Sequence, residues 1–164
     1  MASIEMTSSV GERLLADHQH FDALFAQLLA DMHDGEWCIC QGTWSRFERE
    51  LLEHMAAEEA LVLPIFEVVN PGETARLREE HATVRRLLAD LGVRLELHAV
   101  KEEHVQRLVE SLRSHAARED ALLYRWAARL NPDLQKAVFD RLSSHGVATS
   151  AASSAPNVVS LPPR

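Results

Sequence analysis

The chain has 164 residues, of which 46% are hydrophobic and 26% charged, and its formal net charge is −8 at pH 7. This length and composition predict one globular domain large enough to bury its own core. The acidic balance excludes a surface selected for nucleic acid or anionic membranes, because both favour clustered lysine and arginine. A partner with a basic surface stays open.

The first ten residues contain no basic region, and no stretch of about 18 apolar residues occurs anywhere in the chain. The sequence therefore predicts a cytoplasmic protein with no membrane segment. Its two cysteines, Cys38 and Cys40, are too close for a routine structural disulfide and too few for a cysteine-based zinc site. We expect them to be loop residues in a reducing compartment, and a redox role for the pair is the alternative.

Four segments carry apolar residues at alternating spacings of three and four, the pattern of amphipathic helices that face a common core. Histidines and glutamates occupy some of these core-facing positions. The pattern predicts an all-α fold, an up-down antiparallel four-helix bundle. In chain order the predicted core-facing residues are Leu14, His18, Phe21, Phe25, Leu28 and Met32; Trp44, Phe47, Leu51, His54, Glu58, Leu61 and Ile65; Leu77, His81, Val84, Leu88, Leu91 and Leu95; and Val105, Leu108, Leu112, His115, Glu119, Leu122 and Trp126.

Capping residues and glycines set the predicted ends of these helices. Asp34-Gly35 ends the first helix, and Gly42-Thr43 supplies the N-cap of the second. The third begins at Asn70-Pro71-Gly72-Glu73, which combines a capping residue, a proline at the first helical position and a glutamate at the capping-box offset. Pro64 should kink or end the second helix, because proline removes a backbone hydrogen bond.

The C-terminal part of the chain predicts a short fifth helix and a tail. Asn131-Pro132-Asp133 opens this helix, which should run to about His145 and end on Gly146. Residues 8–146 then form the helical domain. Residues 147–164 are rich in alanine, serine and proline and lack an amphipathic pattern, so they predict a disordered tail.

The pattern His…His-x-x-x-Glu occurs twice among the core-facing residues. Corresponding residues of the two copies are 61 or 63 positions apart, which indicates a duplicated two-helix unit. The copies are His18, His54 and Glu58, and His81, His115 and Glu119.

Burying such groups without partners costs roughly 1 to 7 kcal/mol each, against a domain stability of about 5 to 15 kcal/mol. Two divalent cations would offset this cost, because they bind imidazole nitrogen and carboxylate oxygen directly. The alternative is a polar layer of histidine–glutamate hydrogen bonds. Two symmetric sets of these residues favour metal.

A spacing of four residues places His54 and Glu58 on one helix face, and the same holds for the second copy. A carboxylate has two oxygens and can bridge two ions roughly 3.5 to 4 Å apart, whereas an imidazole binds one ion. The pattern therefore predicts one ion on His18 and His54, another on His81 and His115, and two bridging glutamates.

These motifs resemble the hemerythrin family, in particular its HHE cation-binding domains, over about residues 10 to 130. The resemblance implies an up-down four-helix bundle that holds two Fe ions in a non-haem di-iron centre. Ferritin-like bundles fit less well, because no core-facing histidine has a glutamate three residues before it. The matching segments are Asp17-His18-Gln19-His20-Phe21-Asp22, His54-Met55-Ala56-Ala57-Glu58-Glu59, Glu80-His81 and His115-Ala116-Ala117-Arg118-Glu119-Asp120.

Two positions differ from the oxygen-carrying hemerythrins. Arg85 stands where they have a second histidine on the third helix, so one iron has one nitrogen ligand fewer. Asp120 stands where they have an aspartate ligand on the fourth helix. We keep Glu119 as the ligand, because it faces the core and mirrors Glu58, and expect Asp120 to support a ligand or to substitute for one. Reversible oxygen carriage is the activity that these differences affect.

Three further residues lie near the motifs. Asp22 and Arg85 hold equivalent positions in the two repeats and carry opposite charges, so they either pair across the bundle above the metals or lie separately in water. Tyr124, the only tyrosine, is expected to serve packing rather than redox chemistry. Other histidines, among them His33 and His104, are expected at the surface or at helix ends.

Three functions follow from these expectations. The preferred one is a binding module whose di-iron centre takes up oxygen or a related diatomic such as nitric oxide, for sensing, storage or iron homeostasis. The second is an enzyme that uses the same centre to decompose peroxide or to handle nitric oxide. The third is a structural bundle with zinc, which histidine and carboxylate ligands also accept. No catalytic residue is assigned.

Overall fold

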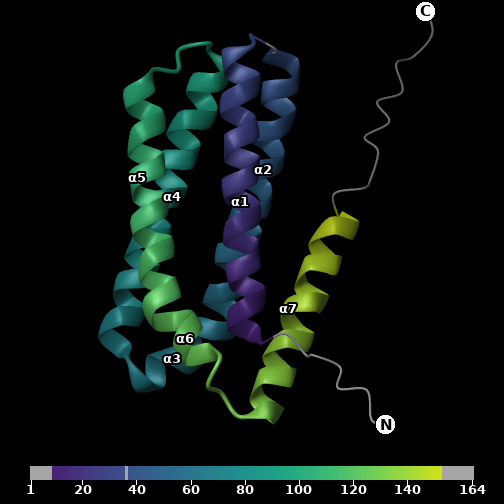
Figure 1. Ribbon diagram of the computed structural model, residues 1–164, viewed down its shortest axis with the longest axis vertical. Coiled ribbons are helices and arrows are strands. Elements are labelled where there is room, and N and C mark those ends of the chain that lie inside the picture. Colours follow the sequence, from purple (N-terminus) through teal and green to yellow (C-terminus); the bar gives the residue numbers. More distant parts are fainter. Residues whose placement is uncertain (1–8, 36, 153–164) are drawn as a thin grey trace, which may run out of the picture.

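The computed structural model describes residues 9–35 and 37–152, and over those residues it contains helices and no strand. Its long helices run alternately up and down, with α1 beside α2 and α4 beside α5 (Figure 1). The predicted all-α, up-down four-helix bundle is confirmed. The four helices are α1 (Val10–His33), α2 (Trp37–Ala57), α4 (Pro71–Glu96) and α5 (Glu102–Arg118).

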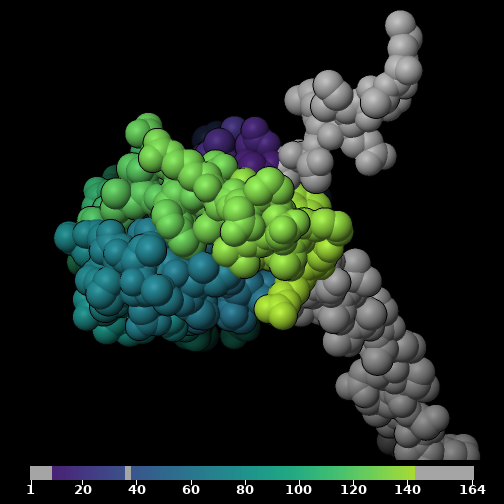
Figure 2. All heavy atoms as spheres, turned by 90° about the horizontal axis from the view of Figure 1, so that it is seen from below, coloured from purple at the N-terminus to yellow at the C-terminus, as the bar shows by residue number. Residues whose placement is uncertain are grey.

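Two of these helices continue through a π-helical segment into a further α-helix. α2 continues through η1 (Glu58–Val62) into α3 (Leu63–Val69), and α5 through η2 (Glu119–Tyr124) into α6 (Arg125–Ala127). Each π-helical segment begins on one of the two glutamates predicted to bridge the metals. Figure 2 shows the lower end of the bundle, where α3 and the chain from α6 into the first part of α7 (Pro132–Ala152) cover the surface.

Pro64 lies in the first turn of α3, where its missing N–H is tolerated. The helix does not end there, because it continues to Val69 after η1. The predicted irregularity is therefore a change of helix type. No proline lies in η2, so a π turn in this fold does not require one.

The π-helical segments shift the core-facing register by one residue. A π turn holds more residues than an α turn, because its hydrogen bonds span five residues instead of four. A regular α pattern below the two glutamates predicts core positions at Leu61, Ile65, Leu122 and Trp126. The structure buries the next residue in each case: Val62, Phe66, Leu123 and Ala127.

The predicted C-terminal end of α1 and the predicted N-terminal start of α4 are confirmed. Asp34 caps α1, and Gly35 follows with φ 75°, a left-handed conformation that glycine adopts at low cost. Asn70 caps α4 by accepting a hydrogen bond of 3.3 Å from the backbone N–H of Glu73.

The predicted start of the second helix is wrong. α2 begins at Trp37, and the Thr43 hydroxyl donates a hydrogen bond of 2.7 Å to buried Asp31 instead of capping a helix. Cys38 and Cys40 therefore lie in α2 and not in a loop. Cys38 is exposed, whereas Cys40 is fully buried in the core.

The fifth helix opens where predicted, with Asn131 Oδ1 accepting a hydrogen bond of 2.8 Å from the backbone N–H of Leu134. α7 continues through Gly146 to Ala152, so the helix end predicted at Gly146 is wrong. It packs against α1, α2 and η1. Within the predicted tail of 147–164, residues 153–164 lie outside the described residues.

Two apolar clusters fill the bundle, one on each side of the layer that holds the predicted metal ligands. Each fully buried leucine or phenylalanine contributes roughly 1.5 to 3 kcal/mol, so the clusters offset the cost of a polar layer between them. The upper cluster includes Phe21, Leu28, Phe47, Leu51, Val84, Leu88 and Leu108. The lower cluster includes Leu14, Val62, Leu63, Phe66, Leu77, Leu123 and Tyr124.

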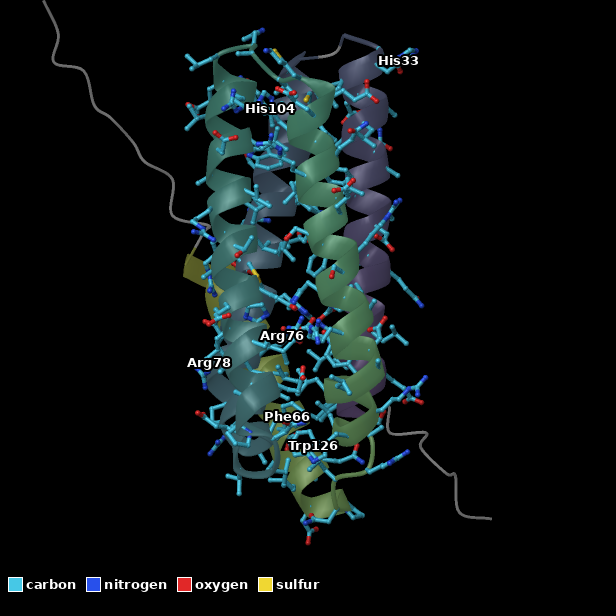
Figure 3. The ribbon with its side chains drawn as sticks, turned by 90° about the vertical axis from the view of Figure 1, so that its left-hand side faces the viewer. His33, Phe66, Arg76, Arg78, His104 and Trp126 are labelled. Atoms are coloured by element: carbon cyan, nitrogen blue, oxygen red, sulfur yellow. The ribbon has the colours of Figure 1, made fainter. Side chains whose placement is uncertain are left out.

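Figure 3 shows the two ends of this arrangement. Phe66 and Trp126 lie together near the lower end, with their ring centroids 5.0 Å apart. His33 and His104 lie at the opposite end, as expected for histidines that belong to helix ends and not to the site. The lower apolar cluster thus includes a packed pair of aromatic rings.

Gly11 brings the start of α1 against η2. A Cβ on Gly11 would lie 2.5 Å from the backbone carbonyl oxygen of Tyr124. We expect Gly11→Ala to lower the free energy of unfolding by about 1 to 3 kcal/mol, the usual cost of overpacking, measured by urea denaturation. Gly42→Ala is the matched control, because nothing lies within 4 Å of a Cβ there and helix propensity should add up to about 1 kcal/mol. Equal losses in both variants would contradict the close approach.

Candidate metal centre

All six predicted ligands meet in one layer of the bundle. The four histidines come from four different helices, and each glutamate is the first residue of a π-helical segment. The layer is almost closed to water, since Glu58, His81 and Glu119 are 0% exposed. The side chain of His18 is the most accessible of the six, at 12%.

Each glutamate extends one oxygen toward each histidine pair. Glu58 Oε1 lies 3.4 Å from His54 Nε2, and its Oε2 lies 3.5 Å from His81 Nε2. Glu119 Oε2 lies 3.2 Å from His18 Nε2, and its Oε1 lies 3.3 Å from His81 Nε2 and 3.1 Å from His115 Nε2. This is the arrangement of two carboxylates between two cation positions.

The ligand atoms form two groups, each with all its atoms within 4.8 Å of one another. One group is Glu58, His81, His115 and Glu119, and the other is His18, His54 and Glu119. Among the described residues, neither Glu58 Oε2 nor His115 Nε2 has a partner in hydrogen-bonding geometry, although both are buried and lie 3.5 and 3.1 Å from a charged neighbour. Such orphaned atoms cost about 1 to 3 kcal/mol each. A cation in the first group would satisfy both atoms, and the second group offers the donors for a second cation, so the donor set fits a pair of metal ions.

Without a bound cation, the histidines and Glu119 of the layer have shifted pKa values. Burial disfavours a charged His81, but hydrogen bonds to Glu119 and Glu58 outweigh burial and raise its pKa to about 10. Burial also disfavours the charged forms of the other three histidines, and nearby carboxylates again outweigh it and raise their pKa: Glu119 at His18 and His115, and Glu58 with Asp17 at His54. Burial works against ionised Glu119, yet the close imidazoles of His115, His18 and His81 hold its pKa well below the usual value.

The Nδ1 atom of every histidine in the layer faces a carboxylate on another helix. Glu59 contacts His81 at 2.9 Å, and Glu80 contacts His115 at 3.1 Å. Two longer contacts complete the set, Asp17 with His54 at 3.4 Å and Asp120 with His18 at 3.3 Å. These outer carboxylates direct each Nε2 toward the centre, as carboxylates behind metal-binding histidines do.

The family comparison covers this whole arrangement. A model described as "Hemerythrin HHE cation binding domain" matches residues 10–127, which include the complete polar layer. The chain belongs to this family. No curated protein and no solved structure matches it. Over the described residues of this hemerythrin domain, none of the helices is both long and apolar enough to cross a membrane.

Arginines hold two of the outer carboxylates of the hemerythrin domain. Arg85 binds Glu59 through two hydrogen bonds, of 2.8 and 3.0 Å. Arg118 binds Glu80 at 2.7 Å and also donates a hydrogen bond of 3.2 Å to Glu73 in the first turn of α4. Two-pronged arginine–carboxylate pairs fix geometry as well as charge. Of the two arrangements considered for Asp22 and Arg85, the structure does not show the pair, because Arg85 binds Glu59.

Tyr124 is the residue of the layer that the sequence did not predict. It packs in the lower cluster, as expected, but its hydroxyl also enters the polar layer. Its hydroxyl donates to Glu58 Oε1 at 2.7 Å and lies 2.9 Å from His18 Nε2. Burial, together with the negative charges of Glu58 and Glu119, raises the pKa of this phenol well above its usual value. The regular α pattern points Tyr124 away from Glu119, and only the π turn of η2 brings it into the layer. The sequence carries no plain signal of that turn.

A cavity of about 530 Å³ reaches the layer from the upper half of the hemerythrin domain. We call it the α1–α5 cavity, because residues of α1, α2 and α5 line it. Most of its lining is apolar, and it touches three of the four histidines of the layer. The lining includes His18, His54, His115, Phe21, Phe25, Phe47, Leu51, Met55 and Leu112, with Asp22, Arg113 and Asp120 as its charged members.

Proposed function

We propose that this hemerythrin domain binds two iron ions, one between His18 and His54 and one between His81 and His115, with Glu58 and Glu119 as bridges. The main observation behind the proposal is that the two oxygens of each carboxylate face different histidine pairs. Each glutamate offers one oxygen to each histidine pair at 3.1 to 3.5 Å. A polar layer built only for hydrogen bonding has no need to leave Glu58 Oε2 and His115 Nε2 without hydrogen bonds.

The donor set favours iron over purely oxygen-binding cations such as magnesium or calcium. Each ion would receive two imidazole nitrogens and two carboxylate oxygens, and imidazole suits iron, zinc and related metals. Two histidines with carboxylates and open positions are typical of non-haem iron(II) proteins. A closed four-coordinate shell is instead typical of structural zinc.

We further propose that the domain binds oxygen or a related small diatomic through the α1–α5 cavity. The apolar lining suits an uncharged molecule, and the cavity reaches His18, His54 and His115. Two bound irons would supply an open coordination site and reducing electrons there. The protein side chains orient the histidines, exclude bulk water with the two apolar clusters, and keep Tyr124 next to the His18–His54 position.

Elemental analysis of protein reconstituted anaerobically with ferrous iron tests the proposal. About two irons per chain, as expected of a two-metal site, together with a spectral change on adding oxygen or nitric oxide, would support it. Zinc alone after reconstitution would favour a structural bundle. Many turnovers of hydrogen peroxide without iron loss would instead favour an enzyme that decomposes peroxide.

Single histidine variants test the ligand assignment. We expect His54→Ala and His115→Ala each to reduce bound metal from about two ions per chain to one or fewer and to lower the melting temperature, because metal binding energy is also folding energy. Metal content and thermal unfolding of the same preparations provide the measurement. His20→Ala is the matched control, since His20 lies on the α1 surface against Glu50. Unchanged metal in either site variant would remove that histidine from the ligand set.

A further inference from the structure

The hydroxyl of Tyr124 lies among four donor atoms that belong to one cation position. Its contacts are 2.9 Å to His18 Nε2, 3.3 Å to His54 Nε2, 2.7 Å to Glu58 Oε1 and 3.2 Å to Glu119 Oε2. All four are the donors assigned above to the His18–His54 ion. Neither histidine of the other pair is among its contacts.

Hydrogen bonding alone does not account for four partners. A neutral phenol donates one hydrogen bond and accepts at most two, so it satisfies three partners. Two of the four partners here are carboxylate oxygens, which compete for the single hydroxyl proton. The Tyr124 hydroxyl therefore has one more partner than a phenol can satisfy by hydrogen bonding.

Coordination geometry accounts for all four contacts. In an octahedral site each donor has four nearest donors, and bonds of 2.0 to 2.2 Å place these neighbours roughly 2.8 to 3.1 Å apart. The four distances around the Tyr124 hydroxyl bracket this range. Two edges between its neighbours are slightly longer than this range, with Glu119 Oε2 3.2 Å from His18 Nε2 and Glu58 Oε1 3.4 Å from His54 Nε2.

The internal repeat makes this feature specific to one ion. Tyr124 follows Glu119 by five residues, as Leu63 follows Glu58 in the first repeat. Both side chains are buried in the lower cluster, but Leu63 has no donor atom. The second cation position therefore has no equivalent of the phenol.

We propose that Tyr124 is a metal ligand, with its phenolate oxygen bound to the ion held by His18 and His54. This inference rests on the proposed two-metal site and adds a fifth protein donor to one ion. Binding replaces the phenol O–H bond with an oxygen–metal bond and releases one proton to solvent. The two ions are then unequal, with five protein donors on one and four on the other.

The spectrum of the ferric protein tests this assignment. Full-length protein is reconstituted anaerobically with ferrous iron and then oxidised with ferricyanide. A phenolate bound to ferric iron produces a visible charge-transfer band and enhanced phenolate vibrations in resonance Raman spectra. Because the chain has one tyrosine, any such signal belongs to Tyr124. We expect the band in the wild-type protein and its complete loss in Tyr124→Phe.

Trp126→Phe is the matched control, since it reduces a neighbouring aromatic residue that packs on Phe66 and leaves the phenol in place. This variant should keep the full band. Wild-type protein that holds two ferric ions without any phenolate signal would overturn the assignment of Tyr124 while leaving the two-metal site intact. Failure of the wild-type protein to hold iron at all would overturn the proposed function and this inference together.

Discussion

Glu119→Gln is expected to reduce bound metal from about two ions per chain to fewer than one. Glu119 is fully buried and lies within 3.3 Å of three histidines, which together span both cation positions. An amide carries no charge and offers only one acceptor oxygen, so it cannot bridge two ions as a carboxylate does. Both ions should therefore be lost from one substitution. Metal content after anaerobic reconstitution provides the measurement.

The same substitution should also destabilise protein prepared without metal. Removing one partner of a buried ionic network costs about 3 to 5 kcal/mol, because the remaining charges lose their compensation. Urea denaturation in the presence of a chelator separates this cost from metal loss. Glu110→Gln is the matched control, because Glu110 is exposed on α5 and should retain wild-type metal content and stability. Two ions retained in Glu119→Gln would eliminate its bridging role.

Stability and metal affinity should respond to pH in opposite directions. In protein kept free of metal by a chelator, the pKa of His81 is raised from 6.5 to about 10. The contribution of His81 to the free energy of unfolding is therefore complete below about pH 6.5 and is lost as the pH rises toward 10. Metal ions require neutral imidazole, so each proton displaced on binding increases affinity about tenfold per pH unit over the same interval. Raising the pH should lower the free energy of unfolding of the metal-free protein and increase its affinity for metal.

Two titrations measure this prediction. Urea denaturation of chelated protein from pH 6 to pH 10 gives the free energy of unfolding, and competition with a chelator of known affinity gives the metal affinity over the same range. His20→Ala should shift neither curve by much, because His20 lies outside the layer. A chelated protein that becomes more stable toward pH 10 would show that the histidines are not held protonated by the glutamates.

The bundle and the site layer were predictable from the sequence because polar residues interrupt an apolar pattern at repeated spacings. His18 lies between Leu14 and Phe21 on one helix face, and the structure buries both neighbours. Buried histidine next to buried leucine is costly without a partner, so the pattern alone indicated a site. The second copy of the motif confirmed the register, and all six residues meet as expected.

The details that the sequence did not predict depend on contacts between distant segments. One extra residue in the turn after Glu119 decides whether Tyr124 or its neighbour faces the centre, and no local residue type signals such a π turn. Arg85 has a long, flexible side chain that reaches Glu59 on another segment, so its partner follows from packing and not from repeat symmetry. The hydroxyl of Thr43 likewise donates to Asp31, so Thr43 does not act as the N-cap that the sequence predicted.

The outer carboxylates have a consequence for the order of assembly. Each one sits beside a core ligand on its own helix and supports a histidine on the next: Asp17 of α1 supports α2, Glu59 beside α2 supports α4, Glu80 of α4 supports α5, and Asp120 beside α5 supports α1. The chain of support closes on itself around the bundle. Because these contacts link all four helices, we expect high-affinity metal binding at the proposed site only after the last helix has docked.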